Sequence, residues 1–163
     1  MNQVLQNPIR SVTPNDISTL KRIIDATNMF PSEMLDDMID NHFNDTKNDE
    51  IWLTYDPAIG GGDPKAVVYC RPEEMTDRTW NLLLIAVDPD SQGKGYGAAL
   101  MTHLEDHLTA LNQRILIVET SGTTEFSRTR KFYRQCQYEE ASCIRDYYED
   151  GDDKITFRKV LQK

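Results

Sequence analysis

A glycine-rich segment between an apolar stretch and a predicted helix has residue types suited to binding an anion. The segment runs from Val87 to Ala98 and reads VDPDSQGKGYGA. Its glycines at 93, 95 and 97 carry no Cβ atom to keep a diphosphate away from the backbone, and Lys94 adds positive charge. Free backbone N–H groups and the positive end of the helix dipole would point at one place there. The pattern predicts a diphosphate-binding turn; the alternative is a turn that only caps the helix.

Two known nucleotide motifs do not fit this segment. The run from Gly93 to Gly97 is one residue short of the dinucleotide fingerprint G-x-G-x-x-G. The other glycine cluster, at 60–62, is not followed by the Lys-Ser/Thr pair of a P-loop, and we expect it to be a hairpin loop.

Two motifs in order resemble those of the GCN5-related N-acetyltransferases (GNAT). Gln92-x-x-Gly95-x-Gly97 is similar to their coenzyme A motif, and the stretch from Thr129 to Tyr138, TRKFYRQCQY, is similar to their downstream helix. A narrower resemblance to a bacterial branch of the family covers 72–88 and 117–154. It is carried by Pro72–Leu82, Val118–Gly122 and Asp146–Lys154, where Asp150 replaces that branch's proline. The family has glycine where this chain has Gln137, which predicts a different end to the helix.

The resemblance implies acetyl-CoA as co-substrate and direct attack of an amine on its thioester. The pantetheine arm would bond to the backbone of one strand, at Ile85, Ala86 and Val87. The diphosphate would lie on the amides of Gln92, Gly93, Lys94, Gly95, Tyr96, Gly97 and Ala98. Tyr133 matches the family's tyrosine near the sulfur, and a phenol can protonate a leaving thiolate. The alternative is that Tyr133 is a packed aromatic residue.

The sequence offers several candidates for the proton acceptor. Glu119, at the end of a predicted strand, is the first candidate; Glu73 and a chain of water molecules are alternatives. Acidic stretches at 33–50 and 139–153 would attract a cationic amine, or are solvated surface. Within them we expect the cluster Asp146, Tyr147 and Tyr148 to face the substrate.

The periodicity of apolar residues predicts an α/β fold with a mixed central sheet flanked by helices. The resemblance implies a single N-acetyltransferase-like domain over residues 1–163, with parallel strands splayed near Val87 and Glu119. Strands are expected at 9–12, 51–55, 66–70, 80–87, 115–118, 138–147 and 154–161, and helices at 13–26, beyond 32, at 95–111 and at 125–136. The run at 82–87 is continuously apolar, so both of its faces should be covered.

Composition narrows the choice of partners. A formal charge of −9 argues against nucleic acid and against an anionic membrane surface as partner. No apolar run reaches the ~18 residues of a membrane span, and the N-terminus lacks the layout of a signal peptide. Three cysteines without C-x-x-C spacing predict free thiols, a cytoplasmic location and no metal site, with Cys136 and Cys143 in the core. His103 and His107 are expected to be solvated.

We therefore expect a cytoplasmic acetyl-CoA-dependent N-acetyltransferase acting on a small, cationic primary amine, and a homodimer is compatible with the family. Three alternatives remain open at this point. The chain could modify a protein lysine or N-terminus, could bind acyl-CoA without turnover, or could be an unrelated nucleotide-binding domain.

Overall fold

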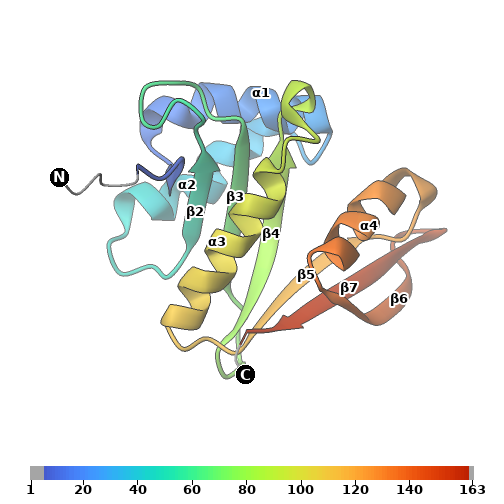
Figure 1. Ribbon diagram of the computed structural model, residues 1–163. Coiled ribbons are helices and arrows are strands. Elements are labelled where there is room, and N and C mark those ends of the chain that lie inside the picture. Colours follow the sequence, from blue (N-terminus) through green and yellow to red (C-terminus); the bar gives the residue numbers. More distant parts are fainter. Residues whose placement is uncertain (1–5, 162–163) are drawn as a thin grey trace. The chain divides into compact units, whose positions relative to one another are not determined.

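The computed structural model describes residues 6–161 and contains a seven-stranded mixed sheet in the order β1-β2-β3-β4-β5-β7-β6. The strands are β1 Ile9–Ser11, β2 Ile51–Tyr55, β3 Ala66–Pro72, β4 Thr79–Val87, β5 Ile115–Ser121, β6 Glu139–Glu149 and β7 Asp152–Val160. The helices are α1 Ile17–Thr27, α2 Leu35–Asn44, α3 Tyr96–Ala110 and α4 Ser127–Gln135 (Figure 1). The expected α/β class and mixed sheet are confirmed. Every helix in the described residues is too short or too polar to cross a bilayer.

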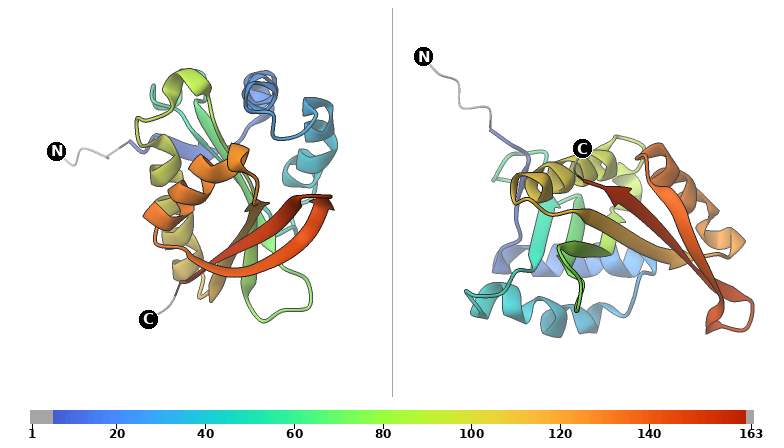
Figure 2. Two further views of the ribbon diagram at one scale, coloured as in Figure 1. Left: turned by 90° about the vertical axis from the view of Figure 1, so that its right-hand side faces the viewer. Right: turned by 90° about the horizontal axis from the view of Figure 1, so that it is seen from below.

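Contacts divide the chain into two compact units. Within the described residues, the first unit comprises 6–70 together with Leu84–His103, and the second comprises Arg71–Leu83 and 104–161. In the first unit, β2 pairs antiparallel with both β1 and β3, so the glycine-rich loop at 60–62 connects a hairpin, as predicted. Helices α1 and α2 cover one face of these strands, and the start of α3 lies on the other face (Figure 2).

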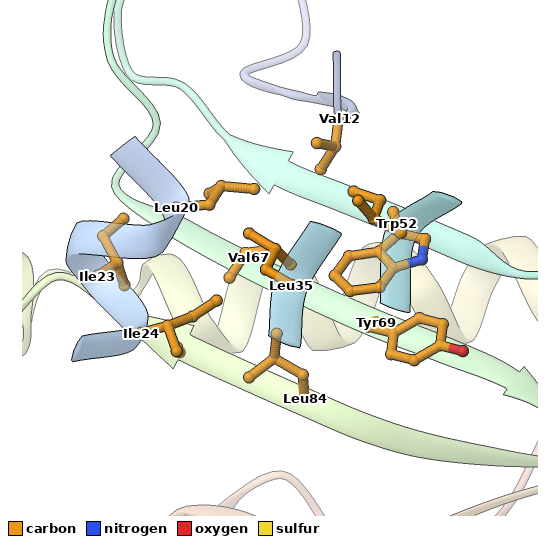
Figure 3. Close-up of a cluster of buried hydrophobic side chains, with 11 residues drawn as sticks. Val12, Leu20, Ile23, Ile24, Leu35, Trp52, Val67, Tyr69 and Leu84 are labelled. Carbon is orange, nitrogen blue, oxygen red and sulfur yellow. The ribbon is translucent and has the colours of Figure 1, made fainter. Parts of the chain in front are cut away.

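Apolar side chains from α1, α2 and the strands fill the core of the first unit (Figure 3). The rings of Trp52 and Tyr69 stack with centroids 4.0 Å apart. The helical spacing of Leu20, Ile23 and Ile24 places all three inside, fully buried. The helix expected beyond residue 32 begins at Leu35, and Met34 is half exposed because it lies in the short 3₁₀ turn Ser32–Met34 that precedes α2.

One buried carboxylate fixes the start of α1. Asp16 accepts two hydrogen bonds from the Arg10 guanidinium, at 2.7 and 2.9 Å, and one from the backbone N–H of Thr13 at 2.8 Å. Burial disfavours the charged form, but the bonds from Arg10 and Thr13 outweigh burial and hold the pKa of Asp16 below its ordinary value. This carboxylate joins β1 to α1.

The second unit is built around β5, which pairs parallel with β4 on one side and antiparallel with β7 on the other. The parallel pairing of β4 and β5, which the family resemblance implies, is therefore confirmed. The parallel register pairs Thr79 with Ile115 and Leu82 with Val118. Lys159 of β7 donates to Glu105 of α3 at 2.7 Å and to the carbonyl of Cys136 at 2.9 Å, so one ammonium joins three segments.

Strands β6 and β7 form a long antiparallel hairpin (Figure 2). All eleven residues of β6 are exposed. Cys143 lies on this strand, so the prediction that it packs in the core is wrong, and Cys136 is only partly buried. The three cysteines are free thiols.

Three further expectations need correction. Leu83 is 40% exposed, so the apolar run in β4 is not covered on both faces, and Leu111 is exposed because α3 ends at Ala110. Gln137 adopts φ = 71°, the left-handed conformation that glycine would take, so the end of α4 is not altered by this residue. The N–H groups of Gln137 and Tyr138 bond to the carbonyls of Arg134 and Tyr133.

We predict that Asp16→Asn destabilises the protein by about 2 kcal/mol at pH 7, because hydrogen bonds to a charged partner are lost. The melting temperature should fall by roughly 4–8 °C for a chain of this size. Because the folded-state pKa is lowered, this stabilisation is present above about pH 4 and is lost as pH falls through the folded pKa. Thermal unfolding at pH 7 and at pH 2.5 checks both statements.

The matched control is Asp36→Asn, which removes an exposed ion pair with Lys21 and should change the melting temperature little. Equal melting of wild type and Asp16→Asn at pH 7 would contradict the prediction, and so would a difference that persists unchanged at pH 2.5.

Candidate active site

The segment after β4 folds as a turn that leads into α3 in the first unit. Asp88 caps the short 3₁₀ helix Pro89–Ser91 by accepting from the N–H of Asp90 at 3.3 Å. The Gln92 side chain then donates to the carbonyl of Val87 at 3.3 Å and closes the turn. Gly93 and Gly95 have φ of 79° and 85°, which L side chains rarely adopt. A Cβ added at either glycine would meet no atom within 4 Å, so the glycines are needed for backbone conformation, with open space in front of them.

A row of backbone N–H groups at this turn lacks acceptors. Among the described residues, the amides from Gly93 to Ala98 make no hydrogen bond, and the first that does is Ala99, to the carbonyl of Gly95 at 3.0 Å. The first N–H groups of a helix have no intrahelical partner, and the helix dipole is positive there. The exposed Lys94 lies in the same turn. The arrangement can therefore receive an anion with several oxygens.

Two side-chain contacts hold the cradle, by which we mean the turn from Gln92 to Ala98. Arg22 of α1 forms an ion pair with Asp88 at 3.1 Å. Burial disfavours the charge on Asp88, but the N–H of Asp90 and the Arg22 guanidinium outweigh it and lower the pKa of this carboxyl. Tyr96 stacks on Tyr55, with centroids 4.2 Å apart. Sequence reasoning missed Arg22, because nothing near it in the chain marks it as a partner of residue 88.

The backbone predicted to bind pantetheine lies in the last three residues of β4. Ala86 is buried, while Ile85 and Val87 are partly exposed. The alternative base Glu73 lies at the other end of this strand: its carboxylate accepts from the Asn81 amide at 3.0 Å.

Tyr133 is buried in the second unit, on α4, with only 3% of its surface exposed. Its ring packs against Phe157 with centroids 5.6 Å apart, and against Tyr138 and Phe132. Its hydroxyl makes no hydrogen bond within the part of the chain that the structure describes. Burial, and then the nearby Cys136, raise the pKa of this phenol, so Tyr133 retains its proton.

Arg130 ties the start of α4 to the end of β5. Its guanidinium donates to the carbonyls of Ser121 at 2.7 Å and Thr123 at 2.8 Å. The Ser121 hydroxyl in turn donates to the Asp152 carboxylate at 2.5 Å. The sequence motif contained Arg130, but sequence reasoning assigned no role to it; in the structure it positions the helix that carries Tyr133.

Glu119 and Tyr133 lie on opposite faces of the second unit's sheet. Val118 and Phe157 are directly paired on β5 and β7, so they point to one face, and Tyr133 packs against Phe157. Glu119 follows Val118 and therefore points to the other face. Strand β5 continues to Ser121, so Glu119 lies within the strand and not at its end as predicted. Its side chain is 32% exposed, and the Lys154 ammonium lies 3.5 Å away.

The predicted substrate-facing cluster divides into two roles. Asp146 has φ = 52°, and its carboxylate accepts from the N–H of Gly151 at 2.8 Å, so it shapes the hairpin turn. Tyr147 and Tyr148 meet edge to face, with centroids 5.1 Å apart, and about half of each is exposed. Burial and then the charge of Glu119 raise the pKa of Tyr148. The structure thus brings the two tyrosines together with Glu119, while the Asp146 carboxylate is occupied by the turn.

The sequence of this chain matches the acetyltransferase (GNAT) domain over residues 47–140, which include the cradle and Tyr133. The chain belongs to the GNAT family. A GNAT-family protein from Desulfovibrio desulfuricans is 26% identical, with a TM-score of 0.84 over 94% of this chain and 98% of its own. No curated protein is significantly similar to this GNAT protein in sequence.

Two more distant structures share the fold. The ribosomal-protein-S18-alanine N-acetyltransferase of Escherichia coli is 22% identical, with a TM-score of 0.75 over 95% of this chain and 94% of its own. The spermidine N-acetyltransferase of Vibrio cholerae, in complex with CoA and spermine, is 16% identical, with a TM-score of 0.76 over 96% of each chain. The family predicted from the two motifs is confirmed.

Proposed function

We propose that this GNAT protein moves an acetyl group from acetyl-CoA to a primary amine, with both substrates bound at once and no covalent enzyme intermediate. The observation that carries the proposal is the row of unpaired amides from Gly93 to Ala98. Both units would serve one acetyltransferase domain, since the Desulfovibrio structure covers 94% of the chain. The three free thiols favour a cytoplasmic location.

The residues of the cradle fit a diphosphate. The amides from Gly93 to Ala98 supply donors without acceptors of their own, and the space in front of Gly93 and Gly95 is open. Lys94 adds a cation at the rim. The edge of β4 at Ile85, Ala86 and Val87 would offer backbone groups to the pantetheine amides. The related Vibrio cholerae enzyme is described in complex with CoA, which supports the same assignment here.

The transfer needs one proton acceptor and one proton donor. Nitrogen of the acceptor amine attacks the thioester carbonyl, the C–S bond breaks, and the thiolate leaves with a proton while the amine loses one. Tyr133 suits the donor role because burial keeps it protonated and its hydroxyl has no partner within the described residues. Glu119 suits the acceptor role because it is an accessible carboxylate on the opposite face. Proton removal and thiolate protonation would thus occur on different sides of one sheet.

A small cationic amine is the acceptor class that we propose. The chain has a formal charge of −9, and the partly exposed Glu119 lies beside two half-exposed tyrosines. Aromatic faces and a carboxylate bind ammonium groups. The Vibrio cholerae enzyme with the same fold is a spermidine N-acetyltransferase seen with spermine, which is consistent with this choice.

Acetyl-CoA and CoA should stabilise the protein against heat, whereas ATP and NADH should do so less. A ligand at 100 times its Kd adds about 2.7 kcal/mol, which raises the melting temperature of a chain this size by roughly 5–10 °C. Gly95→Ala should abolish most of this shift, because alanine disfavours φ = 85° and would move the cradle amides. Differential scanning fluorimetry measures both effects.

Gly60→Ala is the matched control, because Gly60 also has φ = 85° and open space around its Cβ but lies in the β2–β3 loop. Gly60→Ala should destabilise the free protein about as much as Gly95→Ala does, but the rise in melting temperature on adding acetyl-CoA should stay as large as in the wild type. A wild-type protein that responds more to NADH or ATP than to acetyl-CoA would overturn the assignment of the cradle.

Tyr133→Phe should lower kcat by about 10²-fold, because general acid catalysis typically contributes 10²–10⁴. The Kd of acetyl-CoA for this variant should stay within about twofold of the wild-type value. The defect should shrink with an aryl thioester donor, whose thiolate leaves without protonation. Thiol release measured with both donors checks this.

Tyr138→Phe is the control: it removes the hydroxyl that bonds to Glu105 at 3.1 Å, and should lower the melting temperature while leaving kcat nearly unchanged. If Tyr133→Phe keeps wild-type kcat with the alkyl thioester, Tyr133 is a packing residue.

Glu119→Gln should lower kcat/KM by about 10²-fold near neutral pH, because an amide cannot accept the ammonium proton. The loss should diminish at high pH, where more of the acceptor is already neutral. The measurement is the pH dependence of kcat/KM for wild type and variant. Glu125→Gln, which removes one exposed charge elsewhere, should match the wild type; parallel pH profiles for all three proteins would exclude Glu119 as the base.

A further inference from the structure

Lys154 of β7 lies in an environment that would also suit a foreign ammonium group. Its Nζ lies 4.0 Å from the centre of the Tyr147 ring and 3.5 Å from Oε1 of Glu119. Only 13% of the side chain is exposed. A cation over an aromatic face beside a carboxylate is the usual arrangement for binding alkylammonium ions. We call this the ammonium site, formed by Glu119, Tyr147 and the neighbouring Tyr148.

The contacts of Lys154 are weak compared with those of another lysine on the same strand. Among the described residues, the Lys154 ammonium makes no hydrogen bond. Its two contacts are the long ion pair with Glu119 at 3.5 Å and the contact with the Tyr147 ring. Lys159, in contrast, donates to Glu105 at 2.7 Å and to the carbonyl of Cys136 at 2.9 Å. Lys154 therefore occupies its place without the bonds that would fix it there.

The residues that form the ammonium site are themselves exposed to solvent, although they cover most of the Lys154 side chain. Tyr147 is 53% exposed, Tyr148 is 47% exposed, and Glu119 is partly exposed. The Lys154 stem is a flexible chain of four methylenes, so its ammonium can leave without movement of the strand. The end of the lysine side chain is chemically a primary alkylammonium, which is the class of acceptor proposed above.

We propose that the ammonium site receives the acceptor amine, and that Lys154 is an internal occupant which a primary alkylammonium displaces. This inference rests on the proposed function, and it identifies what the acceptor site recognises. When the acceptor takes the place of Lys154, its nitrogen lies beside Glu119, which can then accept its proton. Lys154 thus lowers the apparent affinity for acceptors by the fraction of time that it occupies the site.

The test is binding of butylammonium to the full chain without acetyl-CoA, so that no turnover occurs. Lys154→Met should tighten the Kd by about tenfold, as expected if the internal ammonium occupies the site about 90% of the time. Isothermal titration or two-dimensional NMR measures the Kd. Lys21→Met is the matched control: it removes the same charge from another lysine–carboxylate pair, with Asp36, that is not over an aromatic ring, and should leave the Kd within about twofold.

A second substitution tests the aromatic component. In the Lys154→Met background, Tyr147→Leu should weaken butylammonium binding by roughly threefold or more, since it removes the ring face. Lys154→Gln, which keeps a polar side chain, replaces Lys154→Met if the latter fails to fold. Unchanged or weaker butylammonium binding in the Lys154 variants would overturn the proposal and make Lys154 a packing residue of the hairpin.

The outcomes separate the two proposals. If Lys154→Met binds butylammonium more tightly than the wild type does, but no amine causes thiol release from acetyl-CoA, the ammonium site is supported and the proposed transferase reaction is rejected. Thiol release with an unchanged butylammonium Kd in Lys154→Met supports the reaction and rejects the role of Lys154.

Discussion

The left-handed backbone at Gly93 and Gly95 is the constraint on which the cradle depends. It turns the chain out of β4 and into α3 so that consecutive N–H groups are left without acceptors. Unpaired donors of this kind are unfavourable if they are buried. Here most residues of the turn are exposed, and the space beside Gly93 and Gly95 is open. The buried Asp88, held by Arg22 and by the Asp90 N–H, fixes the point where the turn begins. Contacts within the protein thus stabilise the conformation of the turn, and its unpaired N–H groups stay available to bind an anion.

In the second unit, the alternation of side chains along β5 separates two chemical environments. Val118 and its neighbour Phe157 form an apolar surface under α4, where a phenol stays protonated. Glu119, one residue later, lies on the accessible face with Tyr147, Tyr148 and Lys154. One face of β5 therefore provides the apolar surroundings of the Tyr133 phenol, and the other face carries the Glu119 carboxylate in contact with solvent. The alternation of side chains along β5 is enough to place the two environments on opposite faces of the sheet.

The sequence was most informative where local rules determine structure. The strand before Val87, the glycines after it and the helix that follows could all be predicted, because strand formation, positive φ and helix start are properties of neighbouring residues. Which faces of the strand are covered depends on the rest of the fold, so the exposure of Leu83 could not be predicted. The family motifs added Tyr133. Side-chain partners could not be found this way: Arg22 and Asp88 are far apart in the chain, as are Glu119 and Lys154, and only the fold brings them together. The bond from the Gly151 N–H to the Asp146 carboxylate was likewise not predictable, because it depends on a turn geometry that the sequence does not specify.

Strand β6 has a consequence for how the protein behaves at high concentration. It is the last strand in the sheet order, and all of its residues are exposed, so its outer edge carries backbone groups that no strand within the described residues covers. Such an edge is a template for joining sheets of separate molecules. Its side chains are strongly charged: Glu139 and Glu140 pair with Arg158 and Arg134, and Arg145, Asp146 and Glu149 follow along the strand. Charged side chains on an edge strand disfavour its pairing with another sheet, so the charges of this strand protect the protein from polymerisation through its own sheet.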